Sequence, residues 1–277
     1  MTVTDPGALV VAAAAGLDPG LPYAAPSAAE CEGGVAGLVR LAGGDVAGAG
    51  RLLEPLGFTV DDGTDADTGR PFAVAVSETG GTTPRRWGLY LADLSRPPRF
   101  SVAVPHPAAD VRTEELGLRL WRGVPGSVLA MATVHRGAAA GDADHARATD
   151  TVFHRLWTRV LGPYGVPQVQ PHGFADTSAP EQVAVSTGAG LVTPLAAAVA
   201  DGIAATDAVT TRGWDGTAAP GLRATLNAQG IAATAAGWVW VHVEHNRTVR
   251  DDETRWHPAV DAVAAAVRGA GRTGAPA

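Results

Sequence analysis

Lysine is absent from this 277-residue sequence, so all 21 of its basic side chains are arginines. We attribute this, with the abundance of alanine and glycine, to a GC-rich coding bias and not to function. Cysteine is almost absent too, and a single residue, Cys31, excludes an intrachain disulfide and a cysteine-based zinc cluster. Any metal must therefore be bound by histidine and carboxylate side chains.

An excess of positive charge and long apolar runs are also missing. The net charge of −7 and the pI of about 5.6 argue against a general nucleic-acid binder. The longest apolar run, residues 8–17, is too short to cross a bilayer, so we expect no membrane partner. No basic segment precedes this run, which argues against a signal peptide. The expected location is the cytoplasm, with secretion left open, and the sequence indicates no oligomeric state.

Alternation of apolar strands with helical segments begins near residue 99. The hydrophobic content of 46% is ample for a large core. The pattern predicts an α/β domain of three layers, with a central mixed, mainly parallel sheet and helices on both faces. The expected strands are 99–104, 127–134, 167–170, 182–186, 207–211 and 238–244, and the expected helices are 113–122, 147–161, 191–204, 222–229 and 256–267.

The first 95 residues do not share this alternation. We expect residues 1–95 to be an N-terminal helical and hairpin extension packed on a catalytic domain of residues 96–277. The expected parts of the extension are an irregular start (1–26), two helices (27–41 and 46–56), an acidic loop (61–68) and a hairpin (72–77 with 87–92) that turns at residues 80–84.

Residues capable of chemistry follow four of the predicted strands. They are His106, His135-Arg136, His172 and Glu244-His245. The carboxyl ends of parallel strands lie at one edge of a sheet, where open α/β folds bind ligands. Each residue alone also fits a structural role, such as a turn histidine or a surface ion pair. Their joint position predicts a site at this edge.

Two histidines and a carboxylate fit the ligand count of catalytic zinc, which takes three protein ligands and leaves one position for water. We expect His106, Asp110 and His172 to bind one Zn²⁺ ion. Zinc lowers the pKa of bound water and polarises a carbonyl group.

A further carboxylate has to move the proton of that water. Glu244 is the candidate, because period two in its strand places Trp240, His242 and Glu244 on one face. Arg136 is the candidate anchor for a substrate carboxylate or an oxyanion.

Several other polar residues lie near these positions in the sequence. They could orient the ligands from behind or replace one of them, and the sequence leaves the choice open: Glu114, His135, His145, His242 and Asn227. Ser186 lacks the Gly-x-Ser-x-Gly context of a serine hydrolase.

Three motifs resemble the zinc-dependent exopeptidase and amidohydrolase superfamily of carboxypeptidase-like fold. They are Pro105-His106-Pro-Ala-Ala-Asp110-Val-Arg-Thr113-Glu-Glu115, Gln170-Pro-His172-Gly173-Phe174 and Val241-His-Val-Glu244. The resemblance covers residues 99–268, and the relatives include N-formylglutamate amidohydrolases, aspartoacylases and poly-γ-glutamate hydrolases. It implies zinc bound by the first two motifs and a Glu base in the third.

The first motif departs from the family pattern in two ways. Asp110 stands where Glu is commoner, and it lies four residues after His106 where classical carboxypeptidases have three. Glu114 is the alternative ligand, and a chain without metal is the other alternative.

The expected function is metal-dependent hydrolysis of an amide bond in a peptide or N-acyl amino acid substrate that carries a carboxylate. The alternative is a non-catalytic ligand-binding protein of the same fold that has lost its metal.

Overall fold

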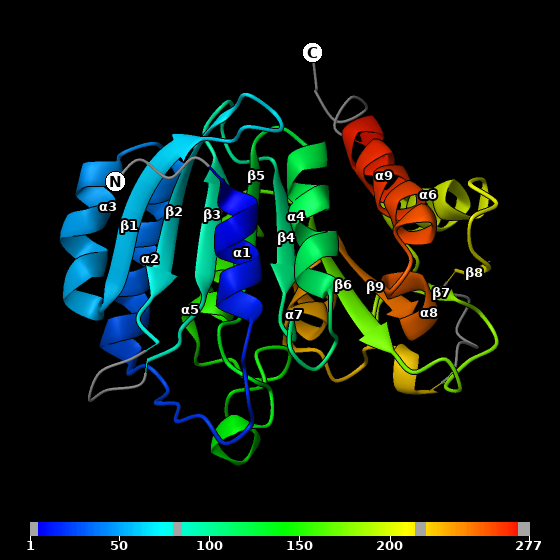
Figure 1. Ribbon diagram of the computed structural model, residues 1–277, viewed down its shortest axis with the longest axis horizontal. Coiled ribbons are helices and arrows are strands. Elements are labelled where there is room, and N and C mark those ends of the chain that lie inside the picture. The colour runs from blue at the N-terminus through cyan, green and yellow to red at the C-terminus, as the bar shows by residue number, and fades with distance from the viewer. Residues whose placement is uncertain (1–4, 80–84, 214–219, 271–277) are drawn as a thin grey trace.

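The computed structural model describes residues 5–79, 85–213 and 220–270. Its described strands form one mixed sheet in the order β1-β2-β3-β5-β4-β6-β9-β7-β8 (Figure 1). The strands are β1 (Phe58–Thr64), β2 (Pro71–Ser77), β3 (Leu89–Asp93), β4 (Phe100–Val104), β5 (Ser127–Met131), β6 (Gln168–Phe174), β7 (Val183–Ser186), β8 (Thr211–Arg212) and β9 (Trp240–Asn246).

The middle of the sheet is parallel. Strands β5, β4, β6 and β9 run in the same direction, whereas β1, β2, β3 and β7 pair antiparallel with at least one neighbour. In the β6–β9 pair, Gln170 lies opposite His242, and His172 lies opposite Glu244. The register therefore brings two predicted site residues, His172 and Glu244, side by side.

Helices cover both faces of the sheet. One layer contributes α1, α4, α6 and α9 to a core cluster that includes Val10, Leu116 and Trp256, and α1, α4 and α9 lie on the near side in Figure 1. The other layer contributes α2, α3, α5 and α7. The helices are α1 (Pro6–Ala14), α2 (Ala28–Ala42), α3 (Val46–Leu53), α4 (Thr113–Gly123), α5 (Val152–Leu156), α6 (Pro194–Ala204), α7 (Ala228–Ala236), α8 (Arg247–Arg250) and α9 (Glu253–Ala270).

Side chains alternate between the two faces of the strands, so that one face packs in the apolar core and the other carries the site. Val169 of β6 and Val241 and Val243 of β9 belong to the cluster under α4 and α9. By period two, Gln170 and His172 of β6 project from the opposite face, toward the layer that contains α7. Apolar side chains thus fix the strands, and the polar ones are left for the site.

The predicted fold class is confirmed: a central mixed sheet, parallel in its middle, lies between two helical layers. The strands of residues 58–93 continue the same sheet. The division into an extension (1–95) and a catalytic domain (96–277) stays a prediction. None of the helices in the described ranges is long and apolar enough to span a membrane.

Several element predictions are wrong in detail. Residues 6–14 of the expected irregular start form α1, and residues 61–64 of the expected acidic loop (61–68) belong to the edge strand β1. The helix expected over 147–161 begins only at Val152 and continues as a π-helical turn, Trp157–Leu161.

Other boundaries shift as well. The helix expected over 222–229 is wrong for most of its length, because residues 220–222 form a 3-10 turn and α7 begins only at Ala228, where Asn227 caps it. The strand expected over 207–211 is the two-residue β8. The hairpin of β2 and β3 is confirmed, whereas its turn at residues 80–84 lies outside the described residues.

Candidate metal centre

The loop after β4 carries His106 and Asp110. The backbone N–H of Asp110 donates to the carbonyl oxygen of His106 at 2.8 Å, which closes a turn between them. Arg112 then takes a left-handed conformation with φ 74°, and α4 begins at Thr113, as predicted. Because Arg112 and not Asp110 precedes the helix, the Asp110 carboxylate is not used as a helix cap.

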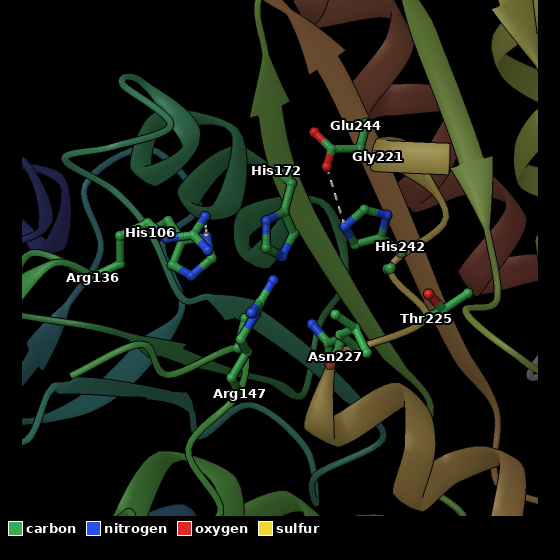
Figure 2. Close-up of a pocket in the computed structure, with 12 residues that line it drawn as sticks. His106, Arg136, Arg147, His172, Gly221, Thr225, Asn227, His242 and Glu244 are labelled. Carbon is green, nitrogen blue, oxygen red and sulfur yellow. Dashed lines mark hydrogen bonds and ion pairs between the residues drawn. The ribbon is translucent and has the colours of Figure 1, made fainter. Parts of the chain in front are cut away.

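The site brings three ligand atoms together from this loop and from β6, and Figure 2 shows two of the residues, His106 and His172, at the same pocket. Oδ2 of Asp110 lies 3.3 Å from Nδ1 of His106 and 3.1 Å from Nδ1 of His172. All three residues are buried, and their ligand atoms lie within 4.8 Å of one another. Asp110 and His172 are 62 positions apart in the chain, and they meet because β4 and β6 are neighbours in the sheet.

The spacing of these atoms fits a small divalent cation. Tetrahedral zinc with ligands at about 2.0–2.1 Å places those ligands about 3.3 Å apart. The two measured separations, 3.3 and 3.1 Å, agree with that value. Two imidazoles and a carboxylate are also the donor set of catalytic zinc sites. The residues present therefore fit the metal that the sequence motifs imply.

Asp144 supports His106 from the other side of its ring. Nε2 of His106 lies 2.7 Å from Oδ1 of Asp144, and the second carboxylate oxygen accepts from Arg136 at 2.7 Å. A metal-binding histidine commonly donates its second N–H to a carboxylate in this way. A neutral His106 ring that donates from Nε2 to Asp144 has its lone pair on Nδ1, on the side of Asp110.

Both aspartates are held ionised. Burial raises the pKa of the Asp110 carboxyl, but hydrogen bonds and charge interactions with His106 and His172 outweigh it, so the pKa lies far below its ordinary value. Burial likewise raises the pKa of Asp144, and the bonds to His106 and Arg136 lower it to about 2. The site therefore keeps one negative charge, that of Asp110, at the proposed ligand position, and a second, that of Asp144, behind His106.

Glu244 lies beside this group at the end of β9. Burial raises the pKa of its carboxyl well above the ordinary value, the Asp110 charge adds to this, and Arg250 and Arg136 oppose it. Oε1 lies 3.5 Å from Nε2 of His242, and Oε2 has no hydrogen-bond partner among the described residues. Such an environment suits a group that gains and loses a proton.

A second ligand group overlaps the first. His172, His242 and Glu244 also have ligand atoms within 4.8 Å of one another. His172 belongs to both groups, and one neutral imidazole binds one metal ion through one nitrogen. The two groups are therefore alternative positions for a cation.

A pocket of about 210 Å³ opens onto the site. Its wall includes His106, His172, His242 and Glu244 together with two arginines, Arg136 and Arg147. The side chain of Arg147 is 59% exposed and approaches Asp144 only to 3.8 Å. The guanidinium groups give this small pocket a positive rim.

Arg250 connects three parts of the site. Its guanidinium donates to the carbonyl oxygens of Val111, Phe174 and His245. These carbonyls follow Asp110, His172 and Glu244 by one or two residues. The side chain is buried, so one cation holds the ends of β6 and β9 and the β4 loop together.

The remaining predicted residues occupy different places. Glu114 lies buried on α4 with Oε2 unpartnered among the described residues, and it belongs to neither ligand group. Nδ1 of His135 accepts from the N–H of Gly137, and neither His135 nor His145 lines the pocket. His145 is fully buried and packs against Phe153. Asn227 lines the pocket and caps α7.

Sequence reasoning did not single out four residues that shape the site: Asp144, Arg147, Gln170 and Arg250. Asp144 stands in the stretch Asp142-Ala-Asp-His145. A carboxylate beside a histidine after a predicted strand could have indicated that Asp144 belongs to the site. Gln170 shares a strand face with His172 by period two. No sequence motif around Arg147 or Arg250 indicated a role in the site, because both roles depend on tertiary contacts of the segments that carry them.

No protein family model matches the chain, and no curated protein is significantly similar to it.

Solved structures do resemble its fold. A metallo-carboxypeptidase from Burkholderia cenocepacia has 16% identity and a TM-score of 0.42, covering 83% of this chain and 69% of that one. A metallo-carboxypeptidase from Pseudomonas aeruginosa, in complex with (2-guanidinoethylmercapto)succinic acid, has 15% identity and a TM-score of 0.40, covering 81% and 68%. N-acetylmuramoyl-L-alanine amidase from Clostridium difficile 630 has 10% identity and a TM-score of 0.38, covering 64% and 98%.

At such identities and TM-scores the similarity assigns no activity, metal or substrate to this chain. Those have to be argued from its own residues.

Proposed function

We propose that this chain is a metal-dependent hydrolase that cleaves an amide bond in a peptide or N-acyl amino acid bearing a carboxylate. The observation that carries the proposal is the meeting of His106, Asp110 and His172 behind a pocket that Glu244 also lines. Zinc bound by the first three residues would polarise the scissile carbonyl and acidify a water molecule.

Glu244 is the proposed proton carrier. It lines the same pocket, its Oε2 atom is unpartnered within the described residues, and its pKa is raised by burial. A carboxyl of raised pKa accepts a proton from water and returns it to the departing nitrogen near neutral pH. His242 contacts Oε1 and keeps the carboxyl turned along the strand face.

The two arginines are proposed to bind different oxygen atoms of the substrate. Arg136 is already paired with Asp144, and its Nη1 atom lies 3.3 Å from Nδ1 of His106, next to the ligand atoms. It is therefore suited to an oxygen on the reacting carbon. Arg147 is more exposed and is suited to a carboxylate at the pocket mouth.

The test combines metal content with turnover. Purified full-length protein should bind one zinc ion per chain and hydrolyse members of a panel of N-acyl amino acids and dipeptides only when zinc is present. Glu244→Gln should keep the zinc and lose turnover by about 10²–10⁴-fold. Glu114→Gln is the matched control: it also neutralises a buried carboxylate with an unpartnered oxygen, and it should keep both zinc and turnover.

Two results would contradict the proposal. Turnover that survives Glu244→Gln would remove the proton carrier. Wild-type protein that binds zinc and carboxylates but hydrolyses no member of the panel would favour the non-catalytic binding protein.

A further inference from the structure

The amino end of α7 is connected to His172 by two buried side-chain amides, those of Asn227 and Gln170. Asn227 caps α7, and its Oδ1 atom accepts from the backbone N–H groups of Gln229 at 2.9 Å and Gly230 at 3.1 Å. Backbone N–H groups only donate, so the atom that faces them must be the amide oxygen. The NH₂ group of Asn227 is thereby turned away from the helix.

That NH₂ group fixes one side of Gln170. Nδ2 of Asn227 donates to Oε1 of Gln170 at 2.8 Å, and an NH₂ group can only donate. The other side is fixed independently through Gln229. Nε2 of Gln229 donates to the backbone carbonyl of His145, so its oxygen must face Gln170, whose Nε2 atom lies 3.2 Å away. Two backbone anchors thus impose the same orientation on the Gln170 amide.

The orientation of Gln170 places an acceptor beside one ring nitrogen of His172. Oε1 of Gln170 lies 3.4 Å from Nε2 of His172 and can only accept. Nδ1 of the same ring lies 3.1 Å from Oδ2 of Asp110, so both nitrogens face acceptors and a neutral ring can donate to only one of them. A cation bound at Nδ1 leaves the hydrogen on Nε2, where Oε1 of Gln170 is already placed to accept it.

We infer that Asn227 and Gln170 are positioning residues that set the tautomer of His172, so that Nδ1 is presented to the metal. The inference rests on the proposed function. Both amides are buried, so water does not compete for these hydrogen bonds. His106 has the corresponding arrangement on its own side, where Asp144 binds Nε2 and leaves Nδ1 toward Asp110.

Asn227→Asp tests the relay with an almost isosteric change. The introduced carboxylate still caps α7, and the two N–H donors keep it ionised. The second oxygen of the introduced carboxylate can only accept a hydrogen bond. The Gln170 amide must therefore turn its NH₂ group toward this oxygen, and that NH₂ group then leaves its present partners, Gln168 and Gln229. The oxygen that accepts from Nε2 of His172 is then lost. We expect zinc affinity, measured by competition with a chromophoric chelator, to fall about 10–100-fold.

Simple electrostatics predicts the opposite sign, because added negative charge attracts a cation. Thr225→Asp is the matched control: it adds the same charge two residues earlier in the pocket wall, outside the relay. Zinc affinity in this variant should be unchanged or higher. Gln170→Glu also adds a negative charge. Either oxygen of the introduced carboxylate can accept from Nε2 of His172, so this variant should bind zinc at least as tightly as the wild type.

A spectroscopic measurement decides the matter if Asn227→Asp does not fold. In the zinc-loaded wild type, long-range ¹H–¹⁵N correlations of the imidazoles should show His172 protonated at Nε2. Protonation at Nδ1, or undiminished affinity in folded Asn227→Asp, would overturn the relay and leave the proposed function standing. Wild-type protein that binds no zinc would overturn both.

Discussion

Asp144 and His106 form the shortest hydrogen bond between a proposed metal ligand and a residue behind it, at 2.7 Å. The carboxylate makes the imidazole a stronger donor to a cation and fixes its orientation. It also holds the guanidinium of Arg136 at the pocket wall. One buried acid therefore prepares both the metal position and the proposed anchor.

Replacing Asp144 by Asn should weaken zinc binding about 10–100-fold, because the amide is a poorer partner for the His106 N–H. Chelator competition measures the change. Asp142→Asn is the control, since Asp142 is exposed in the same loop and should behave as wild type. Equal affinity in the two variants would argue against a role for Asp144.

Gly173 leaves the space that Arg250 needs. A Cβ atom at residue 173 would collide with the guanidinium group, which is buried and held by three carbonyls. Gly173→Ala should therefore lower the free energy of unfolding by about 1–3 kcal/mol, as overpacking does. Denaturant unfolding measures it.

Gly202→Ala is the control for this substitution. Residue 202 lies within α6, and a Cβ atom there would meet no heavy atom closer than 3.6 Å. The change should raise the free energy of unfolding by about 0.5–1 kcal/mol, because alanine favours the helix. Destabilisation of similar size at both positions would show that the Arg250 contact is not the cause.

At the scale of elements, the strands of the site were predictable and the edges of the fold were not. Apolar runs ending in histidine or glutamate located β4, β6 and β9, because buried parallel strands read as continuous apolar segments. The edge strand β1 is half exposed and rich in aspartate, so it read as a loop. Helix α1 is apolar on all sides, without helical periodicity, and only Asp5 before Pro6 indicated its start.

Helix α1 should nevertheless contribute to stability through Val10, which is fully buried in the core cluster. Val10→Asp would bury an unpaired charge and should lower the free energy of unfolding by about 3 kcal/mol or more. Thermal unfolding measures it. Val11→Asp, at a neighbouring position that is 48% exposed, should change it by less than about 0.5 kcal/mol. Equal effects would mean that α1 is not packed as described.

The loop of residues 137–147 shows why part of the site escapes prediction. Asp144 contacts His106, and Arg147 lines the pocket, only because this loop returns to the residues that follow β4. No periodic sequence pattern encodes such a path. The helix expected over 147–161 begins later because Thr151, whose side chain accepts from the N–H of His154, caps α5. The helix therefore begins after its capping residue, Thr151, and not where the amphipathic pattern of the sequence begins.

At the scale of the whole molecule, buried neutral histidines should make stability depend on pH. Burial lowers the pKa of His145 to about 4, and the pKa of His154 to about 4. Between pH 6.5 and 4 the unfolded chain binds protons that the folded chain does not, so the free energy of unfolding falls as the pH falls.

For His145 the stability lost across this window is roughly 3 kcal/mol. Urea unfolding at a series of pH values measures the slope. His145→Phe keeps an aromatic ring against Phe153 and should give a shallower slope between pH 4 and 6.5. An unchanged slope would show that His145 is not buried in the neutral form.

The arrangement of the sheet explains how distant segments share one site. Parallel β4, β6 and β9 end at the same edge, and the β6–β9 register sets His172 beside Glu244. Apolar packing on the opposite face fixes these strands, which leaves the polar face free to carry ligands. The account therefore depends on one cation position shared by the β4 loop and β6.

Anomalous scattering at the zinc absorption edge, on crystals grown with zinc, tests this most directly. We expect one strong peak in contact with Nδ1 of His106, Nδ1 of His172 and the Asp110 carboxylate. A peak bound instead by His172, His242 and Glu244, or no peak near these residues, would contradict the account.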